Sequence, residues 1–513
     1  MQPRLNIVIV GGGTAGWMCA AALAHDLKAD RPEGLCNVRL IESDEIGTVG
    51  VGEATLPHIK DFNDHLGLNE AEFMRRTRAT FKLGIEFADW GRKGGSYIHP
   101  FGDFGHAING AEFVQYWSRA RDLGETASIE AYSYAVQAAR HHRFDFPSED
   151  PASIKSTYAY AYHFDASLYA AFLREFAEAR GVRRTQGRVV EARQSPESGD
   201  IAALVLQSGE EVAGDLFIDC SGFRALLIGQ TLKSEWQDWT PWLPCDRAVA
   251  VACDSDVPPT PYTQSIALEE GWRWRIPLQH RVGNGYVFAS RFLSEEAATE
   301  RLLGLLEGRA QGAPRLLRFG AGRRLQSWRG NCIAMGLASG FLEPLESTSI
   351  YLIQVAITHL LQLLPKPGHP FRPDTRLTAE YNRRVDLEYD RVRDFLILHY
   401  HANAREDGAL WRHTREMDVP DSLLEKMEQF RSRGYIHRYR EGLFSPASWL
   451  AVFMGQDVAP RGHDRLADLL PEAQLIERLS GMRRRIAANV EDMPRHDAFI
   501  RGYCASTAPE NAA

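Results

Sequence analysis

Two carboxylates, Glu343 and Glu346, stand in an otherwise apolar stretch, GFLEPLESTSI (340–350). The strongly apolar segment that follows, 348–364, is typical of a helix stopped by Pro365 and Pro367. A helix N-terminus has unpaired N–H groups and partial positive charge, so it can hold a small anion or the polar edge of a cofactor. In the alternative interpretation, Ser347 or Thr348 only caps the helix and Glu346 favours its dipole. The spacing leaves both open.

Lys82 stands between two apolar residues in a strand-like run, FKLGIEF (81–87), which alternation predicts to be one strand. A lysine that points inward from a strand needs a carboxylate or a functional reason, because burying an unpaired charge is costly. The alternative is a solvated surface lysine, which is the common case. The sequence does not give the direction of the side chain.

Two aromatic patterns could contact a ring-shaped ligand. His99 and Phe101 are predicted to lie in a Gly- and His-rich loop, 92–112, where they can stack on an aromatic ligand or simply be exposed. The run WRWRIP (272–277) alternates indole and guanidinium, which places both indoles on one face of a strand and both arginines on the other. A half-buried strand with a wet face already explains that alternation.

The element that organises the N-terminal part of the chain is a glycine motif, Gly11-x-Gly13-x-x-Gly16. A β-branched run, 6–10, precedes it and an Ala-rich helix, 15–24, follows, while a second apolar strand, 38–41, ends in Glu42. In that context the glycines permit a tight turn, close approach to a pyrophosphate and helix–strand packing, and Glu42 can accept a hydrogen bond from a ribose hydroxyl. The alternative, a glycine-rich turn in another α/β unit, does not explain Glu42.

The remaining pattern is typical of an α/β fold. A glycine-rich loop, 47–55, can follow a cofactor closely. Helices are expected at 113–145 and 164–180, a strand pair at 187–191 and 201–207, and buried strands at 215–220 and 332–337 that return to the first sheet. The region 232–330 is rich in tryptophan and β-type runs, residues 340–345 read as loop, residues 375–505 are mostly helical, and the tail 505–513 is expected to fray.

Composition excludes several classes of function. The chain has 513 residues, a net charge of −8 and no long basic run, which argues against nucleic-acid binding. Seven scattered cysteines without a CxxC pair argue against a disulfide framework or a metal site and favour the cytoplasm. There is no run of 18 apolar residues, so no membrane span is expected, and glycines interrupt the apolar N-terminus, which is therefore not interpreted as a signal peptide.

Four motifs in order resemble the flavin-dependent tryptophan halogenases: GGGTAGW (11–17), GVGEAT (50–55), the WxWxIP pattern (272–277) and GFLEPLEST (340–348). The WxWxIP motif separates that family from most flavin hydroxylases. The resemblance covers roughly residues 5–365 well and the C-terminal third less well. It implies an FAD-binding, Rossmann-like α/β module of the flavin-monooxygenase type at 1–365, with an inserted substrate-side sheet at about 232–330, and a mainly helical substrate-covering module at 366–513.

The resemblance also implies a reaction. A separate NAD(P)H-dependent flavin reductase supplies FADH2, which with O2 and chloride or bromide gives hypohalous acid, and this passes through an internal tunnel to Lys82. Glu346 then orients the electrophile and helps remove the ring proton. Thr348 and Ser349 bind the halide through backbone N–H groups, and His99 and Phe101 sandwich the substrate ring. The residues assigned to the cofactor are Gly11, Gly13, Thr14, Ala15, Gly16, Glu42, Gly52, Ala54, Val189, Leu337 and Ile350.

The chain departs from the tryptophan-specific members at two places. Position 349 is serine where they have glycine, a change that a backbone contact tolerates. Their Tyr-Tyr pair, which grips the amino acid, is absent from the comparable stretch SWLAVF (448–453), where Trp449 can supply an aromatic wall. We therefore expect an indole-like arene, or a tethered or larger substrate, rather than free tryptophan. The alternatives are a flavin monooxygenase that hydroxylates an aromatic and a non-catalytic flavin scaffold. Dimers are common in the family, and a dimer is expected for this chain by that analogy only.

Overall fold

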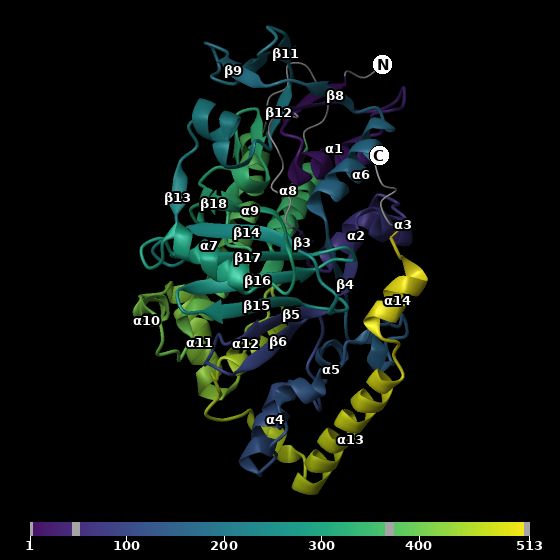
Figure 1. Ribbon diagram of the computed structural model, residues 1–513, viewed down its shortest axis with the longest axis vertical. Coiled ribbons are helices and arrows are strands. Elements are labelled where there is room, and N and C mark those ends of the chain that lie inside the picture. Colours follow the sequence, from purple (N-terminus) through teal and green to yellow (C-terminus); the bar gives the residue numbers. More distant parts are fainter. Residues whose placement is uncertain (1–3, 44–51, 365–373, 507–513) are drawn as a thin grey trace. The chain divides into compact units, whose positions relative to one another are not determined.

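The computed structural model describes residues 4–43, 52–364 and 374–506 (Figure 1). The expectations for Gly47 and Gly50, for Pro365 and Pro367, and for most of the tail 505–513 fall outside these residues. The chain divides into two compact units: unit 1 is Met1–Arg78, Phe164–Pro241 and Phe319–Asp390, and unit 2 is Ala79–His163, Trp242–Arg318 and Arg391–Ala513. Among the described residues, no helix combines the length and the apolar character that crossing a membrane requires.

Unit 1 is built on a six-stranded sheet in the order β20-β21-β12-β1-β2-β8. The strand β1 lies at its centre and pairs in parallel with β2 and β12, and β21 pairs in parallel with β12. A strand buried on both faces reads as a continuous apolar run, which is why the sequence predicted these four strands correctly. The bounds are β1 Leu5–Val10, β2 Cys36–Glu42, β8 Arg183–Gln186, β12 Leu216–Asp219, β20 Trp328–Arg329 and β21 Cys332–Ala334.

Helix α1 packs against α6 and α8 in the same unit. The predicted strand pair is present as β9 and β10, which form a small antiparallel sheet with β11. Another small sheet, β13-β19-β22, includes residues 340–341, which the sequence had placed in a loop. The bounds are α1 Thr14–Asp26, α2 His58–His65, α3 Glu70–Arg76, α6 Ala166–Glu178, α8 Ser349–Leu363, β3 Glu53–Ala54, β9 Val189–Gln194, β10 Ile201–Leu206, β11 Glu211–Ala213, β13 Trp236–Asp238, β19 Gly322–Arg324 and β22 Gly340–Phe341. Helix α9, Thr375–His401, begins in unit 1 and belongs to unit 2 from Arg391 on.

Unit 2 contains the second sheet, with seven strands in the order β18-β14-β17-β16-β15-β5-β6, which lie side by side in Figure 1. All neighbours are antiparallel except β15 and β5. The bounds are β5 Gly84–Ala88, β6 Ser96–Pro100, β14 Arg247–Cys253, β15 Thr263–Leu268, β16 Gly271–Pro277, β17 Val282–Phe288 and β18 Ala310–Arg318. The predicted second sheet and the helical C-terminal region are thus confirmed.

Two local predictions in unit 2 were wrong. The run 81–87 is not one strand: β4 (Thr80–Lys82) pairs with β7 (Ala161–Phe164), while β5 joins the seven-stranded sheet. Residues 80–87 are all buried, and in each strand a phenylalanine stacks on another ring: Phe81 on Phe144 and Phe87 on Tyr97. The predicted loop 92–112 contains β6. The helices are α4 Phe113–Asp122, α5 Tyr134–Arg140, α7 Glu295–Gly304, α10 Ala409–Glu416, α11 Asp421–Arg433, α12 Pro446–Gly455, α13 Glu472–Glu491 and α14 His496–Tyr503.

Candidate active site

The glycine loop of unit 1 is shaped by contacts that a side chain would destroy. Gly11 has φ +113°, and a Cβ there would lie 2.2 Å from the carbonyl oxygen of Cys220. A Cβ at Gly12 would lie 1.4 Å from Oε2 of Glu42, and one at Gly16 would lie 1.8 Å from the carbonyl oxygen of Gly11. Gly13 is the N-cap of α1 and provides no side-chain cap, so the first-turn N–H groups have the character of an anion site.

Glu42 ends β2 beside this loop, as the motif requires. Its carboxylate forms an ion pair with Arg184 and accepts a hydrogen bond from Nε1 of Trp17 at 3.3 Å. These two partners hold the carboxylate at the end of the strand, next to Gly12. The loop, the uncapped helix end and the oriented carboxylate together fit a dinucleotide cofactor.

Several other residues assigned to the cofactor lie around the start of α1. Thr14 and Ala15 form its first turn, and a Cβ at Gly336 would lie 3.0 Å from Cβ of Ala15. The structure therefore brings the 3₁₀ turn that contains Leu337 against the glycine-loop helix. Ile350 is buried in the first turn of α8. The others are placed as follows: Gly52 is buried with φ +90°, Ala54 is buried on β3, and Val189, the first residue of β9, packs against the core cluster that includes Val10 and Ile41.

Glu53 lies between Gly52 and Ala54, and it was not singled out from the sequence. Burial, with a smaller contribution from the Asp165 carboxylate, raises the pKa of Glu53 to about 7. A carboxyl group with such a pKa changes its protonation near neutral pH, which is typical of functional sites. Its position inside the GVGEAT motif was the only available signal.

Glu346 and Ser347 have an unusual backbone in unit 1. Their φ angles are +67° and +58°, a left-handed conformation in two consecutive residues that are not glycine. Such residues persist where the surrounding structure enforces them, and they cluster at functional sites. Glu346 is buried, with 1% of its surface exposed. The strained turn therefore sets the direction of a buried carboxylate immediately before α8.

The start of α8 has the features of a small anion site. Thr348 is its N-cap, but the Thr348 side chain makes no capping hydrogen bond, so the alternative interpretation fails for Thr348. The hydroxyl oxygen of Thr348 is buried and finds no hydrogen-bond partner among the residues that the structure describes. Ser349 is the first helical residue and is half-buried. Unpaired N–H groups, the helix dipole and a buried hydroxyl together suit a halide-sized anion.

Lys82 belongs to unit 2, and its side chain is completely buried. It ends β4, opposite Ala161, and its Nζ lies 5.1 Å from the ring centre of Phe101. Leu83 holds this arrangement, since its N–H donates to the carbonyl of Pro261 and its carbonyl accepts from the N–H of Phe101. The surface interpretation of Lys82 is therefore wrong.

The imidazole of His163 lies on the strand that pairs with β4. Burial first, and then the charge of Lys82, hold its pKa well below the usual histidine value. Its two ring nitrogens contact the hydroxyls of Thr80 and Thr263, each at 2.9 Å. The buried lysine is thus accompanied by a neutral histidine and an aromatic ring.

His99 lies on β6 and is buried, so its predicted placement in a loop and the alternative of an exposed side chain were both wrong. Its ring centroid is 5.6 Å from that of Phe395 and 6.1 Å from that of Phe444. Phe395 stacks on Phe444 at 3.7 Å and contacts Trp449 edge-on at 4.9 Å. The structure therefore joins His99 and Trp449, from distant parts of the sequence, into one aromatic cluster. Phe395 and Phe444 gave no local signal, because each reads as an ordinary core or loop residue.

The WxWxIP strand, β16, is buried along its whole length, so the expected wet face does not exist. Its two indoles contact each other at a centroid distance of 6.1 Å. On the other face Arg275 forms a two-point ion pair with Glu307, both distances 2.8 Å, and Arg273 donates to Oδ1 of Asn284 at 2.9 Å. The arginines are buried because specific acceptors pair with them.

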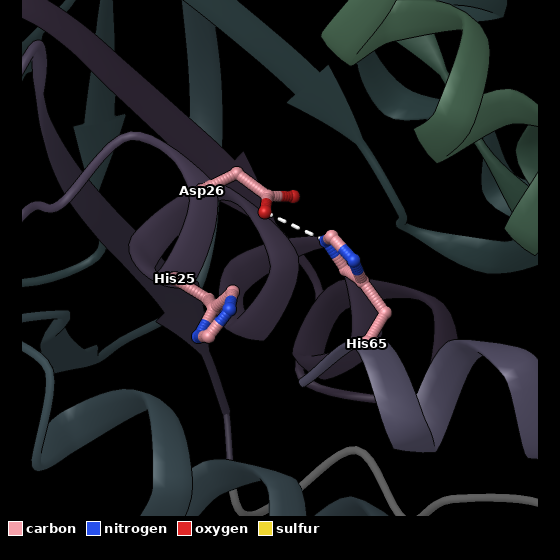
Figure 2. Close-up of side chains that lie close together, drawn as sticks. All are labelled: His25, Asp26 and His65. Carbon is pink, nitrogen blue, oxygen red and sulfur yellow. Dashed lines mark hydrogen bonds and ion pairs between the residues drawn. The ribbon is translucent and has the colours of Figure 1, made fainter. Parts of the chain in front are cut away.

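Within the described residues, His25, Asp26 and His65 form the one group of three side chains that could hold a metal ion (Figure 2). Their ligand atoms lie within 4.8 Å of one another, and Oδ1 of Asp26 is 2.7 Å from Nε2 of His65. This hydrogen bond links the end of α1 to the end of α2 and already occupies the facing atoms. His65 is exposed.

The chain was compared with known proteins. The family model for tryptophan halogenases matches residues 6–472. Tryptophan 6-halogenase SttH of Streptomyces toxytricini is 38% identical over 478 residues, which cover 88% of this chain and 89% of that protein. Xcc4156, a flavin-dependent halogenase from Xanthomonas campestris, superposes with a TM-score of 0.94 at 46% identity, covering 99% of this chain and 100% of that one. BrvH, a flavin-dependent halogenase from Brevundimonas sp. BAL3, gives 0.93 at 44% identity, covering 98% and 99%.

These matches extend over nearly the whole chain and include both units. They favour the halogenase interpretation over the aromatic hydroxylase and the flavin scaffold. With its glycine loop, its WxWxIP strand and its buried Lys82 and Glu346, the chain belongs to the tryptophan halogenase family and is a flavin-dependent halogenase.

Proposed function

We propose that this halogenase uses FADH2, O2 and chloride or bromide to replace a ring hydrogen of an electron-rich arene, an indole or indole derivative. The observation that carries the proposal is the complete burial of Lys82 beside Phe101. An ammonium group is placed in such a position at a considerable desolvation cost, which favours a functional role. The source of FADH2 is a separate NAD(P)H-dependent flavin reductase, and we place the reaction in the cytoplasm.

The cofactor is held in unit 1. The N–H groups at the start of α1, with Gly11, Gly13 and Gly16, bind the pyrophosphate, and Glu42 binds a ribose hydroxyl. The bound reduced flavin supplies the electrons for the O2 chemistry that converts halide into hypohalous acid. Thr348 and Ser349 hold the halide at the start of α8.

The halogen is then delivered by Lys82. Its Nζ holds the hypohalous acid by a hydrogen bond, or carries the halogen as a haloamine, and so fixes where the electrophile meets the ring. The ring replaces one hydrogen by halogen, and its proton passes to the Glu346 carboxylate. The hydroxide of the hypohalous acid leaves as water with a proton from the Lys82 ammonium, and the ring proton taken up by Glu346 makes good that loss. Without a fixed lysine, hypohalous acid would diffuse and react unselectively.

The substrate ring is held by the aromatic residues of unit 2. His99 and Phe101 face it, and Trp449 extends the wall through Phe395. The tyrosine pair of tryptophan-specific members is absent, so an indole without the free amino acid backbone is favoured. SttH is named a tryptophan 6-halogenase, whereas the names of Xcc4156 and BrvH specify no substrate.

A product assay tests the proposal. The purified chain is incubated with FAD, a flavin reductase, NADH, air and bromide or chloride, against indole, tryptophan and a panel of arenes. Mass spectrometry should show the halogen isotope pattern on indole. Lys82→Ala should abolish halogenation and keep FAD binding, while Lys93→Ala, which removes an exposed lysine, should change neither. A hydroxylated product, or an active Lys82→Ala enzyme, would contradict the proposal.

A further inference from the structure

Unit 2 contains a small pocket that the proposed reaction does not use. Three cationic or aromatic side chains from α9, α11 and α12 line it, namely Arg391, Lys426 and Trp449, together with Tyr439 and Phe444 from the segment between α11 and α12. Phe444 is also part of the aromatic cluster around His99. The pocket therefore shares Phe444 and Trp449 with the aromatic cluster that is proposed to face the substrate ring.

The side chain of Arg391 lines this pocket, and one of its N–H groups has no hydrogen-bond acceptor among the described residues. Its Nη1 is buried and has no hydrogen-bond partner among the described residues, while its guanidinium carbon lies 4.1 Å from the ring centre of Tyr439. Gly442 makes room for it: φ is +110°, and a Cβ there would lie 2.6 Å from Nη1. A buried guanidinium N–H that lacks an acceptor is costly, so a ligand that brings an acceptor to this N–H would be stabilised.

Lys426 adds a second cation, and only 11% of its side chain is exposed. Its Nζ lies 4.6 Å from the ring centre of Trp449 and 4.9 Å from that of Tyr439. Its carboxylate partner, Oδ2 of Asp394 at 3.7 Å, is shared, because Asp394 also binds Arg393 at 2.7 Å and accepts from Ser422 at 2.6 Å.

The balance of charge at this pocket is therefore positive. Arg393 and Lys426 pair with one buried carboxylate, Asp394, and Arg391 is a third cation close to Lys426. Burial, with the neighbouring arginines, lowers the pKa of Lys426, against the effect of Asp394. Glu441 contributes a further carboxylate, but from the exposed rim. Half-buried cations flanked by aromatic side chains suit a planar anion attached to a ring.

We propose that Arg391 and Lys426 bind a carboxylate group carried by the aromatic substrate, with Phe444 and Trp449 against the linker between ring and carboxylate. The inference rests on the proposed function for the position of the ring. It names the substrate class as an indole-type arene with a short acidic side chain, either a free acid or the C-terminal carboxylate of a peptide. An α-ammonium group is disfavoured, because it would meet the same two cations.

Equilibrium binding to the full-length chain tests this without any turnover. Calorimetry compares indole-3-propionate, its neutral amide and tryptophan, which is the same acid with an added α-ammonium group. The acid should bind about tenfold more tightly than the amide, which corresponds to one charge-assisted hydrogen bond. Tryptophan should bind more weakly than the acid. Equal affinities for acid and amide, no binding of either, or tighter binding of tryptophan would overturn the proposal.

Two variants and a matched control assign the effect to the pocket. Arg391→Gln and Lys426→Met should each lower the acid-to-amide affinity ratio several-fold, whereas Arg433→Gln, which removes an exposed arginine on α11, should keep it. Binding of the amide in the same variant reports whether the pocket is intact, and Arg391→Lys should restore part of the ratio. An unchanged ratio in Arg391→Gln would refute the assignment.

Turnover separates this inference from the proposed function. The ratio of kcat/KM for halogenation of acid and amide should follow the affinity ratio across the variants. If no halogenated product forms but the affinity ratio still depends on Arg391, the proposed function fails and the carboxylate site stands. The dipeptide Gly-Trp and its C-terminal amide, tested in the same way, distinguish a peptide carboxylate from a free acid.

Discussion

Substitution of Gly16 by alanine tests the packing on which the cofactor loop depends. A Cβ at position 16 would lie 1.8 Å from the backbone oxygen of Gly11, whereas real Cβ contacts stay beyond 3.0 Å. Helix α1 and the loop must therefore separate by about 1.2 Å. Alanine gains about 1 kcal/mol of helix propensity over glycine, but such overpacking costs about 3 kcal/mol. The net loss is about 2 kcal/mol, or about 2 °C in Tm for a chain of 513 residues.

Gly481 provides the matched control. It also lies inside a helix, α13, but a Cβ there would meet nothing within 4 Å. Gly481→Ala should therefore keep or raise Tm. The difference in Tm between Gly16→Ala and Gly481→Ala then measures the cost of the steric overlap at position 16. FAD affinity, measured from flavin fluorescence, should fall about tenfold or more in Gly16→Ala, since displaced N–H groups lose a phosphate hydrogen bond. If Gly16→Ala has the same Tm as Gly481→Ala and binds FAD with the affinity of the parent chain, the reasoning is refuted.

Three further predictions concern unit 1. Thr348→Val removes the buried unpartnered hydroxyl, so it should raise the halide KM about tenfold and raise Tm in halide-free buffer; an unchanged halide KM would contradict a contact between this hydroxyl and the halide. Because the folded pKa of Glu53, about 7, lies above its ordinary value of 4.5, its protonated form stabilises the fold below pH 4.5 and that contribution is lost as pH rises through 7. Glu53→Gln should therefore gain up to about 3 kcal/mol over the parent between pH 5 and 8 in denaturant unfolding, and parallel pH profiles would refute the shift. EDTA should leave halogenation unchanged, because the cluster in Figure 2 is interpreted as a hydrogen-bonded pair; loss of activity that zinc restores would show otherwise.

The parts of the fold that could be predicted are those whose signal is local. A continuous apolar run marks a buried parallel strand, and a glycine pattern before an Ala-rich helix marks the cofactor loop, so β1, β2, α1 and α8 were placed nearly to the residue. The division of 81–87 between two sheets was not predictable, because it depends on the hydrogen bond from Leu83 to Pro261. The burial of Arg275 likewise depends on Glu307, which lies 32 residues away.

In the candidate site, too, some residues could be predicted from the sequence and others could not. Glu346 and Thr348 could be named because they stand in a recognisable motif, and Lys82 because the family resemblance implies a lysine at its position. The left-handed backbone at Glu346 had no signal, since it is imposed by the turn between Pro344 and α8 on residues that do not favour it. Arg391 and Phe444 were missed because helix and loop residues of these types are common, and only the fold brings them to one pocket.

The order of the strands has a consequence for biosynthesis. The central strand β1 leaves the ribosome first, but its neighbour β12 follows only at residue 216 and β21 only at residue 332. At the usual rate of synthesis, roughly 15–65 s pass between the first and the last of these strands. During that time the edge of an apolar strand stays unpaired, and its free backbone groups can pair with another chain, which promotes aggregation. Nascent chains halted before residue 332 should therefore depend on chaperones, and neither unit can be produced as one uninterrupted fragment, since each is assembled from three separate segments.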